Sequence, residues 1–283
     1  MPYIKINDCN YYYELRNDKL KSNHDKESIL LVHGHPFDHT MWRYQYESLG
    51  EYRLILPDLK GYGKTDFSFE KIYIEDQAQA LRSLVEHLQI QSVHLIGLSM
   101  GGQIIVEFAR LFPEITKSLV ICCSNPSGET EESYQKRLNL ADRIEAIGME
   151  SYTWTDIYKY LHQQTIKNCT PEYKHLFKMM LNTKVKGAVA SLRGRAERRC
   201  NLSFLEEIRK PVLVIAGDSD YFTPPDEMKM IASKIKDADF VCIDDAGHMP
   251  NMEQATKFNE ALKSFYGKRI ISSENCNKAN QIL

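Results

Sequence analysis

The sequence predicts an α/β fold with a mostly parallel, eight-stranded sheet, an antiparallel hairpin at its start and one inserted helical segment. Three observations support this prediction. Short β-rich runs alternate with segments of helical periodicity along most of the 283 residues. The β-rich runs are almost continuously apolar, as is typical of strands that are covered on both faces. Between residues 125 and 200, helical patterns follow one another with no convincing strand between them.

The strands are expected to start with a hairpin at the edge of the sheet. Residues 3–7 and 10–16 flank an Asn-Asp-Cys turn signal and have the composition of paired strands. The remaining strands are predicted from the apolar runs at 29–33 (ILLVH), 53–57 (RLILP), 92–96 (SVHLI), 118–122 (SLVIC), 212–216 (VLVIA) and 240–243 (FVCI).

Two segments between these strands predict amphipathic helices. Apolar residues recur at helical spacing, at Ile74, Ala78, Leu81, Val85 and Leu88 in the first segment and at Ile104, Ile105, Phe108 and Leu111 in the second. After Lys210 the alternation of strands and helices resumes. Residues 1–124 and 201–271 are therefore expected to form one domain, with residues 125–200 as a helical lid and residues 272–283 as a flexible tail.

The charge balance gives no sign of a strongly basic nucleic-acid or membrane binder. Lys and Arg number 36 against 38 Asp and Glu, so the chain as a whole offers no attraction to polyanions. No apolar run approaches the roughly 20 residues of a membrane span, and polar residues stand where a secretory signal needs an apolar core. We therefore expect a cytoplasmic protein with a small-molecule substrate and no nucleic-acid or membrane partner. The oligomeric state stays open.

The segment Gly97-Leu98-Ser99-Met100-Gly101 matches the pattern G-x-S-x-G, in which a serine stands on a sharp turn. The context fits, because the motif follows a predicted strand and opens a predicted helix. Side chains at Gly97 or Gly101 would collide with neighbouring backbone as the chain doubles back. The start of the helix also presents free N–H groups, so Ser99 is a candidate nucleophile and the Met100 N–H a candidate oxyanion donor.

A serine hydroxyl needs a base, and His248 is the best placed of the nine histidines. It lies in a turn after the last predicted strand, on the side where open α/β sheets bind ligands. A carboxylate must then hold the imidazole. Asp220 is the preferred candidate; Asp218 is its rival, which could instead cap the turn.

The order nucleophile, acid, histidine, together with the flanking motifs, strongly resembles the α/β-hydrolase superfamily. The likeness covers nearly the whole chain and includes HGHP at 33–36 and PDLKGYGKT at 57–65. Within the superfamily, HGHPFDHTMW at 33–42 resembles 3-oxoadipate enol-lactonases, small carboxylesterases and cofactor-free haloperoxidase-like enzymes. The resemblance implies Asp220 as the acid, no cofactor, and a second oxyanion N–H from His35. The His35 side chain departs from the phenylalanine or tryptophan that is more usual there.

The remaining candidates concern the substrate pocket. Phe37 and Trp42 are expected as pocket walls, although apolar residues beside motifs are as often ordinary core. The arginines of KGAVASLRGRAERR at 186–199 flank an apolar helical stripe, so Arg193 or Arg195 could grip a substrate carboxylate in a bidentate contact. The alternative is a solvated lid surface. Two glycines within this segment weaken the prediction of one continuous helix.

The segment from His33 to His39 superficially resembles the H-x-H-x-D-H zinc motif, but its spacing contains one residue too many. Zinc needs three or four ligands at about 2.0–2.3 Å, so the register matters. We expect no metal site here. His33 is predicted to bond to backbone and His39 to be exposed.

These observations predict a serine hydrolase that cleaves a carboxylic ester or lactone of a small, largely apolar substrate through an acyl-enzyme. Two alternatives stay open. The same residues could pass the acyl group to another acceptor or to peroxide, or the chain could be a ligand receptor that retains the pocket of a hydrolase.

Overall fold

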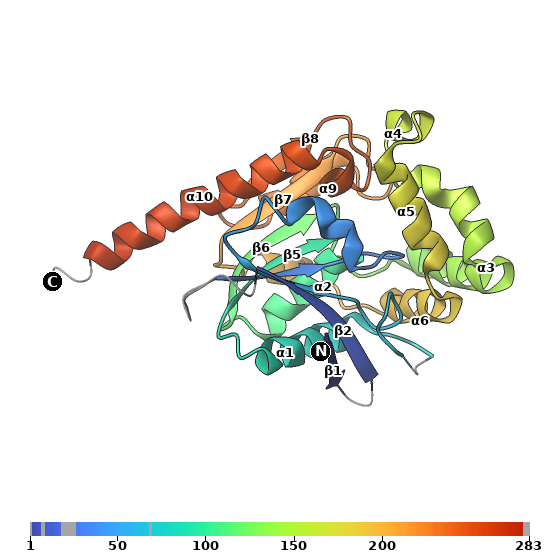
Figure 1. Ribbon diagram of the computed structural model, residues 1–283, viewed down its shortest axis with the longest axis horizontal. Helices are drawn as coiled ribbons and strands as arrows, with labels where there is room; N and C mark the ends of the chain where they lie inside the picture. The colour runs from blue at the N-terminus through green and yellow to red at the C-terminus, as the bar shows by residue number, and fades with distance from the viewer. Residues whose placement is uncertain (1, 7–8, 18–26, 68–69, 280–283) are drawn as a thin grey trace.

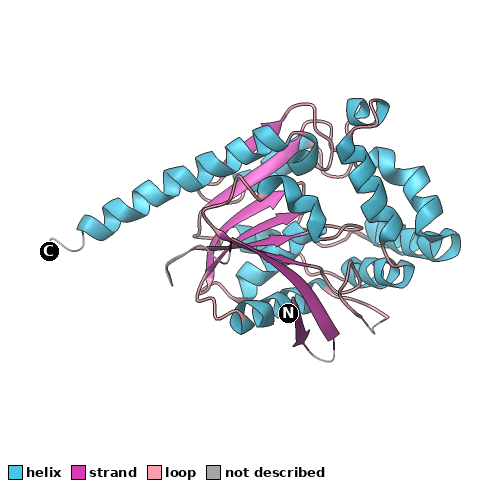
Figure 2. Ribbon diagram, viewed as in Figure 1, coloured by secondary structure: helices cyan, strands magenta, loops and turns pink. Residues whose placement is uncertain are grey.

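The computed structural model describes residues 2–6, 9–17, 27–67 and 70–279, and it has helices on both faces of one sheet (Figures 1 and 2). The sheet has eight strands in the order β1-β2-β4-β3-β5-β6-β7-β8. β1 pairs antiparallel with β2, β2 pairs antiparallel with β4, and the other neighbours are parallel. The strands are β1 (Tyr3–Ile6), β2 (Cys9–Arg16), β3 (Ser28–Val32), β4 (Arg53–Pro57), β5 (Val93–Leu98), β6 (Thr116–Cys122), β7 (Val212–Gly217) and β8 (Asp239–Ile243). The predicted fold class is confirmed, while the predicted turn at residues 7–8 lies outside the described residues.

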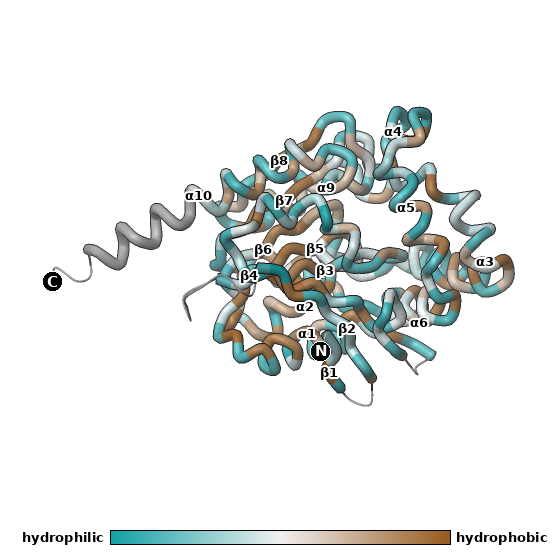
Figure 3. Tube along the Cα trace, in the orientation of Figure 1, coloured by the Kyte–Doolittle hydropathy of each residue, from teal (hydrophilic) through white to brown (hydrophobic). Residues whose placement is uncertain are grey.

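Alternate residues of the central strands pack into two hydrophobic clusters on opposite faces of the sheet. On β3, Ile29 and Leu31 belong to one cluster, whereas Leu30 and Val32 belong to the other. Every residue of β3 is buried, as expected for a parallel strand that is covered on both faces. Figure 3 shows the most apolar residues concentrated along these central strands.

Different helices cover the two clusters. One face is covered by α1 (Ile74–His87), α2 (Met100–Leu111) and α8 (Pro225–Ser233). The other face is covered by η1 (His39–Gln45), α9 (Pro250–Glu253) and the first turns of α10 (Ala255–Ala279). Consequently α2, which begins directly after Ser99, is held by burial of its apolar side against the sheet.

Every element between β6 and β7, a stretch that the structure describes completely, is helical. These elements are α3 (Glu131–Asp156), η2 (Ile157–Lys159), α4 (Gln163–Lys167), α5 (Pro171–Asn182), α6 (Val185–Ala196) and α7 (Leu202–Leu205). α3 bends at Gly148, whose φ of 74° is not helical. Figure 1 shows α3 to α6 gathered at one end of the molecule. The predicted lid is therefore a group of helices at that end.

The lid helix α6 packs very close to the core. A Cβ atom on Gly187 would lie 1.9 Å from the carbonyl oxygen of Gly61, and one on Gly194 would lie 2.2 Å from that of Ile72. Ile72 also donates its N–H to the Ala190 carbonyl at 3.0 Å. The two glycines lie within one continuous helix, contrary to the expectation from propensity, because only glycine permits this contact between backbones.

Of the two predictions for histidines after β3, the one for His33 is confirmed and the one for His39 is wrong. His33 donates from Nδ1 to the Gly34 carbonyl and accepts the Leu59 N–H at Nε2, so its predicted bonding to backbone is confirmed. The predicted exposure of His39 is wrong. Its ring is buried between two carboxylates, with Nδ1 at 2.7 Å from Asp58 and Nε2 at 3.1 Å from Glu14. The pairing compensates the burial of an imidazole that the sequence alone places at the surface.

The C-terminal helix α10 continues to Ala279 and so includes most of the segment 272–283. The flexible tail expected there stays a prediction, and residues 280–283 lie outside the described part of the chain. No helix in that described part is both long enough and apolar enough to cross a membrane.

Candidate active site

Ser99 stands on a sharp turn between β5 and α2. Its φ of 57° lies in the region that favours glycine, which is the strained geometry expected of the serine in this motif. A Cβ atom on Gly97 would lie 2.4 Å from the Gly101 carbonyl oxygen, and one on Gly101 would lie 2.1 Å from that of Val32. The collisions that the sequence predicts at these two glycines are confirmed.

Residues of β6 and the loop after it hold this turn from the side. The Ser99 N–H donates to the Cys122 carbonyl at 2.9 Å, and Ser124 Oγ donates to the Ser99 carbonyl at 2.6 Å. The Ser99 side chain lines a cavity of about 360 Å³. The turn is therefore fixed by backbone contacts that leave its hydroxyl facing an open space.

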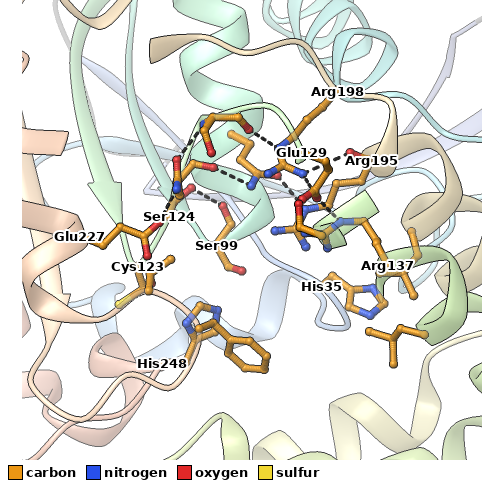
Figure 4. Close-up of a pocket in the computed structure, with 18 of the residues that line it drawn as sticks. His35, Ser99, Cys123, Ser124, Glu129, Arg137, Arg195, Arg198, Glu227 and His248 are labelled. Carbon is orange, nitrogen blue, oxygen red and sulfur yellow. Dashed lines mark hydrogen bonds and ion pairs between the residues drawn. The ribbon is translucent and has the colours of Figure 1, made fainter. Parts of the chain in front are cut away.

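His248 lines the same cavity and is held by Asp220. The imidazole Nδ1 lies 2.9 Å from each carboxylate oxygen of Asp220. Figure 4 shows the Ser99 hydroxyl and the His248 ring turned toward the same part of the cavity. Within the described residues no hydrogen bond joins them. The three residues nevertheless come together at the carboxyl ends of the strands, as the sequence predicts for an open α/β sheet.

Asp220 is buried and accepts further hydrogen bonds. The Phe222 N–H donates to it at 2.8 Å and the Thr223 hydroxyl at 2.6 Å. Burial alone would raise the pKa of Asp220, but the neighbouring His248 and these donors hold it below its ordinary value. An ionised carboxylate in this position favours the imidazole tautomer with its proton on Nδ1, which leaves Nε2 without a proton.

Asp218, the rival candidate, has a separate place. Its two carboxylate oxygens accept the N–H groups of Asp245 and Ala246, at 3.0 and 3.2 Å. These bonds join the turn after β7 to the loop that carries His248. Asp218 therefore supports that loop, and Asp220 is the carboxylate that contacts the imidazole.

The loop after β3 passes directly beside Ser99. A Cβ atom on Gly34 would lie 3.1 Å from the Ser99 Cβ and 3.0 Å from the Leu98 carbonyl oxygen. His35 follows in the chain and lines the cavity. Met100 begins α2, where a backbone N–H has no acceptor within the helix. The two residues that the sequence predicts as oxyanion donors are therefore both near the serine: Met100 follows it in the chain, and His35 follows the glycine that passes beside it.

Phe37 and Trp42, expected as pocket walls, lie in the hydrophobic core. Phe37 is buried with its ring edge-on to Tyr160, and the ring centroids are 5.5 Å apart. Trp42 is buried beside Phe258. Both residues belong to the hydrophobic cluster on that face of the sheet.

The side chains of Arg193 and Arg195 contact different parts of the molecule, although only one residue separates them on α6. Arg193 pairs with Asp142 and Glu145 of α3, at 2.9 and 2.7 Å, and is not among the residues that line the cavity. Arg195 lines the cavity and donates from Nε to Gln103 Oε1 at 2.8 Å. Side chains that are two positions apart on a helix point in directions that differ by roughly 200°, so only one of this pair can face the cavity.

Sequence reasoning missed the charged wall around Arg195. Arg137 of α3 and Arg198, which follows α6, pair with the same oxygen of Glu129, and all of them line the cavity (Figure 4). Burial would raise the pKa of Glu129, but Arg137, Ser133 and Arg198 lower it to about 2. Arg198 belongs to the arginine-rich segment of the sequence, whereas residues 129–137 carry no motif that could reveal them.

Aromatic side chains form another side of the cavity, next to His248. The rings of Phe222 and Tyr160 lie 4.9 and 6.0 Å from the His248 ring, centroid to centroid. They also contact each other, at 4.9 Å. Tyr160 comes from the helical segment between β6 and β7 and Phe222 from the loop after β7, so both segments contact the imidazole.

Two groups of side chains in the described part of the chain bring three potential metal ligands within 4.8 Å of one another. One group is Cys123, Asp220 and His248; the other is Asp38, His39 and Asp58. In each, a histidine Nδ1–H already donates to a carboxylate, at 2.9 or 2.7 Å. His33 and His35 of the zinc-like segment belong to neither group, whereas its Asp38 and His39 belong to the second.

Comparison with known sequences identifies the family. The sequence pattern of the alpha/beta hydrolase family matches residues 29–261. The 2-hydroxy-6-oxononadienedioate/2-hydroxy-6-oxononatrienedioate hydrolase of Paraburkholderia phymatum is 26% identical over 274 residues, which cover 90% of this chain and 92% of that protein.

Solved structures give the same result. An esterase from Thermogutta terrifontis, solved with malate bound, is 31% identical with a TM-score of 0.86, over 92% of this chain and 94% of that one. The enol-lactonase from Burkholderia xenovorans LB400 shares the fold, at 21% identity and a TM-score of 0.86, over 94% of this chain and 100% of that one. The resemblance drawn from the sequence motifs is confirmed, and the protein is an enzyme that belongs to the alpha/beta hydrolase family.

Proposed function

We propose that the protein is a serine hydrolase that cleaves a carboxylic ester or lactone of a small molecule through an acyl-enzyme. The observation that carries the proposal is the buried Asp220–His248 pair, with Nδ1 at 2.9 Å from both carboxylate oxygens, beside a serine on a strained turn. This constellation meets the requirements for activating a hydroxyl that is otherwise a weak nucleophile.

In the proposed reaction, Ser99 Oγ attacks the carbonyl carbon while His248 Nε2 takes its proton and later gives it to the leaving oxygen. The backbone N–H groups of His35 and Met100 stabilise the charge on the carbonyl oxygen. Water, activated by the same histidine, then releases the acid. Ser99 and His248 have no hydrogen bond in the free protein, and such contacts commonly tighten only in the substrate complex.

Two further observations support a small carbonyl substrate. The cavity volume of about 360 Å³ is at the lower end of the usual range for small-molecule sites. The relatives include proteins named as an esterase, an enol-lactonase and a dienedioate hydrolase. The sequence predicts a largely apolar substrate. The aromatic side of the cavity suits such a substrate, whereas the arginines on another side favour a charged group in addition.

The proposal is tested by the turnover of p-nitrophenyl butyrate and by labelling with a fluorophosphonate. The wild-type protein is expected to turn the ester over continuously and to be labelled at Ser99. Ser99→Ala should lose about 10⁴- to 10⁶-fold in kcat while its circular dichroism spectrum stays unchanged. A Ser99→Ala protein within tenfold of wild type would overturn the mechanism, and labelling without sustained turnover would favour the ligand receptor.

A further inference from the structure

The cavity has a cationic side that the proposed attack on an ester carbonyl does not use. Arg137, Arg195 and Arg198 gather around Glu129 there, away from Ser99 and His248 (Figure 4). Glu129 pairs with Arg137 and Arg198. Within the described part of the chain, no carboxylate lies at ion-pair distance from Arg195.

The other acidic residue of the lining does not supply the missing partner. Glu227 accepts a hydrogen bond from Asn125 and stands beside Ser124, on a different side of the cavity (Figure 4). Three arginines and two glutamates therefore line the space. Because Glu227 is engaged elsewhere and the one charge of Glu129 is shared by Arg137 and Arg198, the arginine cluster carries excess positive charge, and Arg195 is its member without an ion pair to a carboxylate.

Arg195 is held in a fixed relation to the nucleophile. Its Nε donates to Gln103 Oε1 at 2.8 Å, and Gln103 Nε2 donates to the Asn125 carbonyl at 2.8 Å, which sets the orientation of the amide. Gln103 lies one turn after Ser99 on α2. In the described structure only Nε of the guanidinium has a hydrogen-bond partner, so the two terminal nitrogens keep their donors for a ligand.

The His35 side chain adds a second polar group without a partner. It is only 5% exposed and lines the cavity; Nδ1 lies 2.7 Å from the Tyr62 hydroxyl, and Nε2 has no hydrogen-bond partner among the described residues. Burial, together with the charges of Arg195 and Arg137, lowers the pKa of His35 well below its ordinary value, so the ring is neutral. When the Tyr62 hydroxyl donates to Nδ1, the neutral ring carries its proton on Nε2, and a ligand that accepts a hydrogen bond from Nε2 favours this tautomer.

We propose that the substrate carries a carboxylate in addition to the ester or lactone group, and that Arg195 and the Nε2–H of His35 bind this carboxylate. The proposal rests on the hydrolase function proposed above and names its substrate class. A carboxylate accepts two parallel bonds from the edge of a guanidinium and a further bond from a neighbouring N–H. It would pair the charge of Arg195 and give the already buried ring nitrogen a partner, whereas a wholly apolar substrate would desolvate the guanidinium without compensation.

Matched pairs of esters test the proposal on both sides of the scissile bond. For the acyl side, mono-p-nitrophenyl glutarate is compared with p-nitrophenyl 5-methylhexanoate, in which an isopropyl group replaces the carboxylate. For the leaving-group side, 4-acetoxybenzoate is compared with 4-isopropylphenyl acetate. We expect at least one anionic ester to exceed its neutral partner about tenfold or more in kcat/KM.

Variants then assign this preference to residues. Arg195→Met keeps much of the side-chain volume and should lower kcat/KM for the preferred anionic ester about 30-fold, while the neutral ester changes less than threefold. His35→Phe keeps a ring and the backbone N–H, and should cost the anionic ester about three- to tenfold. Arg193→Met is the matched control outside the cavity. A preference for the neutral ester in both pairs, or an equal loss for both members of a pair in Arg195→Met, would overturn the proposal.

A binding measurement separates this proposal from the hydrolase function. Titration calorimetry of the Ser99→Ala protein gives its dissociation constant for glutarate. Adding Arg195→Met should raise this constant about tenfold or more. The Ser99→Ala protein should bind the uncharged glutaramide as weakly as the double variant binds glutarate. Arg195-dependent binding of glutarate without turnover of any ester would support the carboxylate site and contradict the hydrolase function. Turnover of neutral esters without glutarate binding would contradict the carboxylate site alone.

Discussion

The Ser99 side and the Arg195 side of the cavity are built on opposite electrostatic principles. Beside Ser99, Asp220 is matched by donors from His248, Phe222 and Thr223 before any ligand binds. Beside Arg195, three arginines have only Glu129 as an ion-pair partner within the cavity lining of the described chain. The chain therefore satisfies Asp220 internally, whereas we propose that a ligand completes the arginine side.

This difference follows from where the two sides come from. The residues around Ser99 extend from the carboxyl ends of β5, β7 and β8, so the packed sheet fixes their positions. The arginines come from α3, α6 and the segment after α6, which cover that edge of the sheet. If the core places the chemistry and the insertion binds the substrate carboxylate, as we propose, the two can vary independently.

The largest expected effect is at Asp220. Asp220→Asn should keep the side-chain shape but no longer favours the tautomer with the proton on Nδ1, so we expect kcat for p-nitrophenyl butyrate to fall about 10⁴-fold. Steady-state kinetics of the purified variant measure this directly.

Asp218→Asn is the matched control for that change. It keeps one acceptor for the N–H groups of Asp245 and Ala246, so it should lower the thermal midpoint while kcat stays within about tenfold of wild type. If Asp218→Asn were the more damaging of the two, the assignment of the acid would be wrong.

The two sides also differ in how far the sequence predicts them. Ser99, Asp220 and His248 each follow a predicted strand, and parallel strands end at one edge of a sheet, so strand patterns alone bring these residues together. Arg195 and Glu129 are brought together by the packing of α3 on α6, which helical periodicity does not determine. Helix propensity also gave the wrong expectation at Gly187 and Gly194, because their cost to a helix is visible in the sequence and their contact with Gly61 and Ile72 is not.

Glu253 bonds both to the loop that carries His248 and to the helical segment between β6 and β7. The free energy of unfolding should therefore change with pH as Glu253 titrates. It accepts the N–H of Gly247 at 2.8 Å and that of His162 at 2.6 Å. Burial raises the pKa of Glu253 to about 7, although these donors oppose the shift. The folded state thus prefers the protonated form, so the stability from Glu253 is fully present below pH ~4.5 and is lost as the pH rises through ~7, by roughly 3 kcal/mol.

Glu253→Gln removes this titration. Relative to wild type, the free energy of unfolding of the variant should therefore rise by roughly 3 kcal/mol between pH ~4.5 and ~7.5. Urea denaturation of both proteins across this range gives the difference, from which the contributions of all other titrating groups cancel. A difference that stays constant with pH would mean that Glu253 is ionised throughout.

The close packing of α6 against Ile72, next to Arg195, can be disrupted by a substitution at Gly194. Gly194→Ala places a methyl group against the backbone oxygen of Ile72, which cannot move aside as a side chain can, so α6 must shift. We expect a loss of about 1–3 kcal/mol in the free energy of unfolding. The KM for the anionic ester should rise more than that for its neutral partner. Gly267→Ala, where nothing lies within 4 Å, is the control and should be neutral or slightly stabilising.

The smallest change in activity and stability is expected at Arg193, and it tests most directly whether Arg195 rather than Arg193 binds the substrate carboxylate. Arg193 and its partners Asp142 and Glu145 are 31%, 66% and 57% exposed, so water and salt screen their attraction. Arg193→Met should therefore change the free energy of unfolding by less than about 1 kcal/mol, and this difference should shrink in 1 M NaCl. Its kcat/KM for the anionic ester should equal that of wild type within error. A loss as large as that of Arg195→Met would mean that the charge of the lid as a whole, and not one inward-facing guanidinium, selects the substrate.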